Sequence, residues 1–235
     1  MRTRFFLPLA LAAALFTAQP VFAQNINELI RQVTTAIQAK NFSAAEAISR
    51  SIITVEPNNP AGYYGLGVAL YNQGNLAEAI TNYRTAIRLN PNLAPFYNNL
   101  GSALRNQGNL AEAITNHRTA IRLDPNNASA YSNLGLALKD QGNLVEAITN
   151  YRTAIRLDPN YAYAYTNLGA ALYDQGNLTE AINNLRTAIR LDPNLAPAYS
   201  SLGGILIQQG NLAEAITNLR TAIPAILILK HLYYK

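Results

Sequence analysis

Histidine and cysteine are the side chains best suited to acid–base, nucleophilic or metal chemistry near neutral pH, and this chain has very few of them. It contains two histidines, His117 and His231, and no cysteine. Metal sites and catalytic dyads need several such groups close together, whereas one histidine lies in a repeated segment and the other near the C-terminus. We therefore expect no catalytic residues, no metal site, no cofactor and no enzyme activity.

The carboxylates recur at fixed places. Glu78 follows Asn75 by three residues, which is the spacing at which an asparagine oxygen accepts from the helix amide of the glutamate and the glutamate returns the bond. The same pair recurs as Asn109 with Glu112, Asn143 with Glu146, Asn177 with Glu180 and Asn211 with Glu214. Three aspartates, Asp124, Asp158 and Asp192, directly precede prolines. These places indicate structural rather than catalytic carboxylates.

The elements that carry these residues follow a regular repeat, whose period is that of a two-helix hairpin. Proline recurs at Pro57, Pro91, Pro125, Pro159 and Pro193. Glycine recurs in two series, one at Gly67, Gly101, Gly135, Gly169 and Gly203 and one at Gly74, Gly108, Gly142, Gly176 and Gly210. Within one unit we predict a first helix over 62–73, a turn at Gly74 and Asn75, and a second helix over 76–89 that ends before Pro91.

Apolar residues of the second helix recur at intervals of three and four, which places them on one buried stripe. In the first unit of this pattern they are Ala79, Ile80, Tyr83, Ala86 and Ile87. Small residues at Gly67 and Ala79 allow the two helices to approach closely. Arginines lie off the stripe, and we expect them on a solvated outer face, with a basic strip for acidic surfaces as the alternative.

The spacing of Tyr63, Leu66, Gly67, Leu70, Ala79, Tyr83, Ala86 and Pro91 resembles the tetratricopeptide repeat signature. The resemblance implies an all-α solenoid of antiparallel helix pairs that form a right-handed superhelix, with the first helix of each pair lining a concave groove. It divides the chain into a degenerate unit at 24–59, full units at 60–93, 94–127, 128–161 and 162–195, and a truncated unit at 196–223.

The second helix is nearly copied from unit to unit, while the first helix varies, so the resemblance places the variation in the groove. One row of first-helix places carries Gly65, Asn99, Asn133, Asn167 and Ser201. One turn further on are Tyr71, Arg105, Lys139, Tyr173 and Ile207, followed by Asn72, Asn106, Asp140, Asp174 and Gln208. Asparagine offers a donor and an acceptor to a peptide backbone, so these residues are the candidate groove contacts. The alternative is that the asparagines bond neighbouring helices.

These features predict a scaffold or adaptor that binds a protein or peptide in its groove. Two alternatives remain: a docking or regulatory subunit for a separate enzyme such as a glycosyltransferase, and a self-associating structural protein of the cell envelope. Nucleic acid is not an expected partner. The chain has 18 basic residues, of which Arg2 and Arg4 would leave with the signal peptide proposed below. The remaining 16 basic residues only slightly outnumber the 13 acidic residues, and they do not cluster as in a nucleic-acid-binding surface.

The N-terminus has the layout of a secretory signal peptide. Arg2 and Arg4 precede an apolar run over 5–16, and Val21 and Ala23 are the small residues that signal peptidase accepts. We expect cleavage after Ala23 and export to the periplasm or the medium. An uncleaved anchor is the alternative, although the apolar run falls short of the roughly 20 residues that span a bilayer.

Both ends of the array depart from the repeat. In the degenerate first unit the run AEAI begins at Ala45, two residues late relative to Pro57. At the other end Pro224 interrupts the second helix, and we expect that helix to end there. Residues 224–235 then form an apolar tail, which is a substitute cap, a surface for homo-oligomers or a truncated reading frame.

Overall fold

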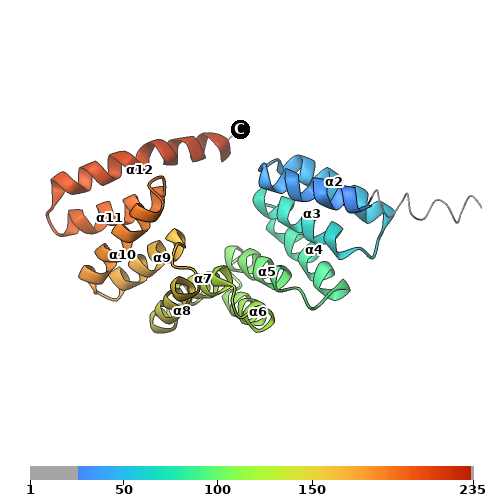
Figure 1. The fold of residues 1–235 in the computed structure, drawn as a ribbon, viewed down its shortest axis with the longest axis horizontal. Coiled ribbons are helices and arrows are strands. Elements are labelled where there is room, and N and C mark those ends of the chain that lie inside the picture. Colours follow the sequence, from blue (N-terminus) through green and yellow to red (C-terminus); the bar gives the residue numbers. More distant parts are fainter. Residues whose placement is uncertain (1–25, 234–235) are drawn as a thin grey trace, which may run out of the picture. The chain divides into compact units, whose positions relative to one another are not determined.

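Helices follow one another along the chain, joined by short connections, as the repeat predicts (Figure 1). The computed structural model describes residues 26–233, with side chains to residue 222, and every regular element in that range is helical. Above the level of the repeats, the chain divides into two larger compact units, the first over residues 1–92 and the second over residues 93–235. The first contains helical residues 26–38, α2 (Phe42–Val55), α3 (Pro60–Asn72) and α4 (Leu76–Leu89). The second contains α5 (Ala94–Asn106), α6 (Leu110–Leu123), α7 (Ala128–Asp140), α8 (Leu144–Leu157), α9 (Ala162–Asp174), α10 (Leu178–Leu191), α11 (Ala196–Gln208) and α12 (Leu212–Tyr233).

Each hairpin pairs a first helix, helix A, with a second, helix B. Helices α3, α5, α7, α9 and α11 are A helices, and each packs against the B helix that follows it. In the second unit each A helix also contacts the next A helix, as α7 does with α9. The predicted all-α solenoid of antiparallel helix pairs is therefore confirmed.

The predicted helix limits agree closely with the structure. Helix α4 covers the predicted residues 76–89. Helix α3 begins two residues earlier than predicted, at Pro60, because proline suits the first helical position and the Asn59 side chain caps the helix, accepting from the Ala61 amide at 3.0 Å.

The turn between the helices has the predicted left-handed residue. Gly74 has a φ of +86°. The Asn75 amide donates to the Leu70 carbonyl at 2.9 Å, which is the six-to-one bond of a Schellman motif. In the first hairpin Lys40 takes this place with a φ of +55°, a conformation that a side chain disfavours.

Lys40→Gly is expected to stabilise the chain by about 1 kcal/mol, because glycine adopts a positive φ without the steric penalty of a Cβ atom. Urea denaturation followed by circular dichroism measures the change. Lys40→Ala is the control and should give no such gain, since alanine keeps the Cβ atom. Equal stabilisation by both substitutions would contradict the backbone explanation.

The first hairpin keeps the register of the repeat although its AEAI run lies two residues late in the sequence. Helix α2 begins at Phe42, one repeat period before α4 begins at Leu76, and both helices have 14 residues. Ala45 is fully buried at the place that Ala79 takes in the next hairpin. The turn and the buried alanine set the register, so the late AEAI run does not displace the helix.

The predicted asparagine caps form in only part of the array. The Asn177 and Asn211 oxygens accept from the Glu180 and Glu214 amides at 3.3 and 3.4 Å. Asn75, Asn109 and Asn143 make no such bond, so the prediction is wrong for them. The side-chain amides of Asn109 and Asn143 donate to Gln107 and Gln141 instead, which holds them away from the helix end.

In the hairpins from α3 onward, the core forms where a large helix B residue lies on a helix A glycine. A Cβ atom on Gly135 would lie 2.6 Å from the Tyr151 ring, and one on Gly67 would lie 2.7 Å from the Tyr83 ring. Both tyrosines are almost completely buried. The small residue that allows close approach, as predicted at Gly67, is therefore required by sterics.

The prediction that Pro224 ends its helix is wrong. Helix α12 continues from Leu212 to Tyr233. Proline's fixed φ is compatible with a helix; it removes one amide donor and disfavours the preceding turn, and both effects are finite penalties. No helix within residues 26–233 is long and apolar enough to cross a membrane. The predicted signal peptide at 1–23 lies outside the described residues, as do the side chains of the tail at 224–235.

Candidate functional site

The asparagine row connects neighbouring A helices. The side-chain amide of Asn133 donates to the Asn98 oxygen at 3.2 Å, and that of Asn167 donates to the Ser132 hydroxyl at 3.3 Å. Asn99, Asn133 and Asn167 are each half-buried. One donor of Asn133 and of Asn167 therefore serves the solenoid, as in the alternative given above, and the carbonyl oxygens of both remain as candidate acceptors for a peptide.

His117 connects this row to the core. Its Nδ1 lies 2.9 Å from the Asn98 oxygen, and both side chains are buried. Burial lowers the pKa of His117 to about 4, with a smaller effect from the charge of Arg105. The imidazole is therefore neutral at pH 7, with Nδ1 donating to Asn98 and with no partner for Nε2 among the described residues.

The sequence placed His117 at a core tyrosine position but missed its bond to Asn98. A comparison of the hairpins could have found it. The hairpin with His117 carries Asn98 on helix A, whereas the hairpin with Tyr151 carries Ser132 at the same place. The hairpin whose core ring is a histidine therefore also carries an asparagine at this helix A place, and the asparagine oxygen can accept a hydrogen bond from the imidazole.

The predicted charged groove residues pair with one another across consecutive hairpins. The Arg105 guanidinium lies 2.6 Å from the Asp140 carboxylate, and the Lys139 ammonium lies 2.9 Å from that of Asp174. These side chains are 28–40% exposed, so each pair contributes less than about 1 kcal/mol to stability. Their main effect is to neutralise this row of the helix A face.

The other predicted contacts lie at the C-terminal ends of A helices. Tyr71 and Asn72 are half-buried at the end of α3, where the Asn72 amide donates to the Val68 carbonyl at 2.8 Å. Asn106 is exposed at the end of α5, and Tyr173 is half-buried at the end of α9.

A hollow of about 280 Å³ lies between the A helices α9 and α11. It is lined by Ala170, Tyr173, Asp174, Ser200, Ser201, Gly204 and Ile205. The sequence explains the space, because Ser201 replaces the asparagine of the earlier hairpins and Gly204 has no side chain at the place of Leu136 and Ala170. A Cβ atom on Gly204 would meet no atom within 4 Å. Two predicted groove residues, Tyr173 and Asp174, therefore border a real depression.

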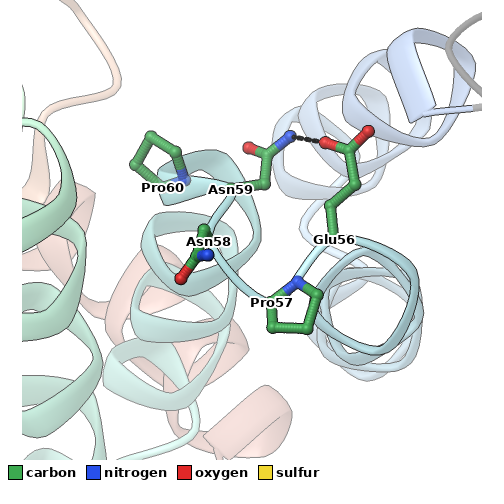
Figure 2. Close-up of a pocket in the computed structure, with 5 residues that line it drawn as sticks. All are labelled: Glu56, Pro57, Asn58, Asn59 and Pro60. Carbon is green, nitrogen blue, oxygen red and sulfur yellow. Dashed lines mark hydrogen bonds between the residues drawn. The ribbon is translucent and has the colours of Figure 1, made fainter.

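A second hollow, of about 460 Å³, lies at the connection between α2 and α3. Figure 2 shows its lining, in which the Asn59 amide points toward the Glu56 carboxylate and donates to it at 2.8 Å. The Asn59 oxygen caps α3, and the Tyr63 hydroxyl donates to the Pro57 carbonyl at 2.9 Å. These polar groups are occupied in fixing the connection, so we assign this hollow a structural role.

Sequence reasoning also missed a ladder of ion pairs on the B helices. Arg118 pairs with Glu146, Arg152 with Glu180 and Arg186 with Glu214, each at 2.8 Å, and Arg50 pairs with Glu78 at 3.1 Å. The signal was the constant sequence separation between arginine and glutamate, which is the same in all four pairs. Arg118, Arg152 and Arg186, which were expected on the solvated outer face, are thus each neutralised by the next hairpin, which weakens the alternative of a basic strip. Within the described part of the chain, no group of three or more acidic or histidine side chains is arranged to hold a metal ion.

Family models agree with this architecture. A model of the TPR repeat matches residues 69–108, 101–142, 136–176 and 170–206, and a tetratricopeptide repeat model matches 196–223. The chain belongs to the tetratricopeptide repeat family. Among curated proteins no sequence matches it.

Solved structures of other tetratricopeptide repeat proteins share the fold. The crystal structure of MamA is 28% identical, covers 68% of this chain and 93% of its own, and has a TM-score of 0.57. The Cut9–Hcn1 hetero-tetramer of APC/C is 20% identical, with 85% and 40% covered and a TM-score of 0.78. YrrB, described as a TPR protein with an unusual peptide-binding site, is 22% identical, with 75% and 95% covered and a TM-score of 0.57.

Proposed function

We propose that this protein is a non-enzymatic scaffold that binds an extended peptide segment of a partner protein on the A helices of its second unit. The hollow between α9 and α11 carries the proposal. Its volume of about 280 Å³ lies below the roughly 300–1,000 Å³ of pockets for small molecules, so it suits one side chain of a longer ligand.

The lining has the chemistry that such a segment requires. Ser200 and Ser201 carry hydroxyls that donate and accept, and the Tyr173 ring offers a flat apolar surface with a polar end. The ion pair with Lys139 uses one carboxylate oxygen of Asp174, and the other remains as an acceptor for a peptide amide. Ala170, Gly204 and Ile205 supply an apolar floor.

The fold gives this proposal general support, since YrrB shares it and is described as having a peptide-binding site. We also propose that binding takes place outside the cytoplasm, in the periplasm or the medium, on the basis of the signal-peptide layout of residues 1–23.

Filling the hollow tests the proposal. Ser201→Asn combined with Gly204→Leu restores the side chains that earlier hairpins carry at these places, so the fold should persist. We expect peptides selected from a random phage-displayed library on the wild-type chain to bind the double variant at least about tenfold more weakly, since one buried apolar side chain is worth roughly 1.5–3 kcal/mol.

Thr149→Asn is the control, because it adds an asparagine to an exposed place on the B helix α8. It should leave the affinity of the selected peptides unchanged. If the selected peptides bind the filled variant as tightly as the wild type, or if the library yields no peptide for the wild type, the proposed site is wrong.

A further inference from the structure

The outward face of α12 exposes apolar residues that are buried or half-buried in the inner hairpins. Leu212 is 58% exposed and Ile216 is 51% exposed. Ile114 in α6 and Ile148 in α8 take the equivalent place in their hairpins, and each is only 5% exposed. The difference has a simple cause, because α6 and α8 each pack against the A helix of the following hairpin, α7 and α9 respectively.

The covering hairpin has the same chemistry at the junction of α6 with α7 and at that of α10 with α11. Its A helix contributes a fully buried small residue: Ala130 packs against the cluster of Ala120 and Ile121, and Ala198 packs against that of Ala188 and Ile189. Its B helix contributes a glutamate in the first turn, which receives the arginine of the preceding hairpin, as Glu214 receives Arg186 at 2.8 Å.

Arg220 is the next arginine of this ladder. It is exposed, and it forms no ion pair with the described residues. After Glu214 the sequence has no further acidic residue, while Lys230 and Lys235 follow Arg220. We use the term α12 face for Leu212, Ile216 and Arg220. Among the described residues, this face combines exposed apolar area with a positive charge that forms no ion pair.

A second copy of the chain is poorly suited to this face. The first hairpin has polar residues exposed on its leading helix, including Asn27, Thr34 and Gln38, and it carries Ala44 where the other hairpins have the pairing glutamate. Two α12 faces placed together would bring like charges near each other. The described exposed face of the first hairpin is therefore polar, whereas the α12 face is apolar and basic.

We propose that the α12 face docks a helical hairpin of a different protein, one that presents small apolar residues on one helix and a carboxylate in the first turn of the next. The partner would bury Ile216 as Ile148 is buried in α8, which packs against α9, and its carboxylate would receive Arg220 as Glu146 receives Arg118. This surface is distinct from the hollow between α9 and α11, so the two proposals can fail independently.

The test uses a fluorescently labelled peptide that copies residues 128–157, which contains Ala130 and Glu146, and follows its anisotropy during titration with the full chain. We expect Ile216→Asp to weaken binding by at least about tenfold, since it places a charge in an apolar contact. Arg220→Glu should weaken it by roughly fivefold, the scale of an exposed ion pair. A probe with Glu146→Arg should restore binding to the Arg220→Glu chain.

Arg190→Glu is the matched control, because it makes the same charge change at an exposed arginine of α10 and should have little effect. Three results would overturn the proposal. One is a probe that does not bind. Another is binding that neither Ile216→Asp nor Arg220→Glu weakens. The third is a chain that forms oligomers which Ile216→Asp, or removal of residues 224–235, dissociates; a second copy would then be the occupant.

Discussion

Tyr151→Ala is expected to lower the free energy of unfolding by about 3–5 kcal/mol, the range for removing a fully buried aromatic side chain. Tyr151 is 0% exposed and lies against Gly135, where a Cβ atom would be 2.6 Å from the ring. Because a glycine faces the ring, no neighbouring side chain at that place can move into the cavity. Urea denaturation followed by circular dichroism measures the loss.

Tyr151→Phe separates the ring from its hydroxyl. The hydroxyl is buried and has no hydrogen-bond partner among the described residues, and burial raises the pKa of the phenol, so it remains uncharged. Removing an unsatisfied polar group should leave stability unchanged or increase it by up to about 1 kcal/mol. A phenylalanine variant as unstable as the alanine variant would show that the hydroxyl, and not the packing of the ring, stabilises this hairpin.

Acidification is expected to remove about 3 kcal/mol of stability through His117 alone. Its pKa falls from 6.5 to about 4 on folding because burial disfavours the imidazolium. Between these two pH values the unfolded chain binds more protons than the folded chain. The contribution of His117 is therefore fully present above pH 6.5 and declines as the pH is lowered toward 4.

The measurement compares unfolding free energies of the wild type and His117→Leu from pH 7 to pH 4. Leucine is the natural residue at this place in the hairpin of Leu185. The variant should show a smaller loss on acidification, and the difference between the two curves removes the contribution of the other titrating groups. Parallel curves would mean that His117 is already accessible to protons in the folded chain.

Local structure was largely predictable from the repeated sequence. The limits of α4 and the left-handed glycine at Gly74 depend on residues within one hairpin, so their sequence signals are short and recur in each hairpin. Where two local interactions competed for the same residue, the sequence did not show which of them would form. Asn109 donates to Gln107 instead of capping its helix, and Pro224 lies within α12 although proline disfavours a helix interior.

The sequence by itself determined the repeat, the helical hairpins, their turns and the buried glycine contacts. Only the tertiary structure decided which polar side chains meet: Arg105 with Asp140, Asn133 with Asn98, and Arg118 with Glu146. Each of these pairs joins residues of consecutive hairpins that lie far apart in the sequence, so it depends on how one hairpin stacks on the next. The hollow beside Tyr173 and the exposure of Ile216 also depend on how hairpins stack. The hollow forms because the neighbouring hairpin has small side chains at this place, and Ile216 is exposed because no described A helix covers it.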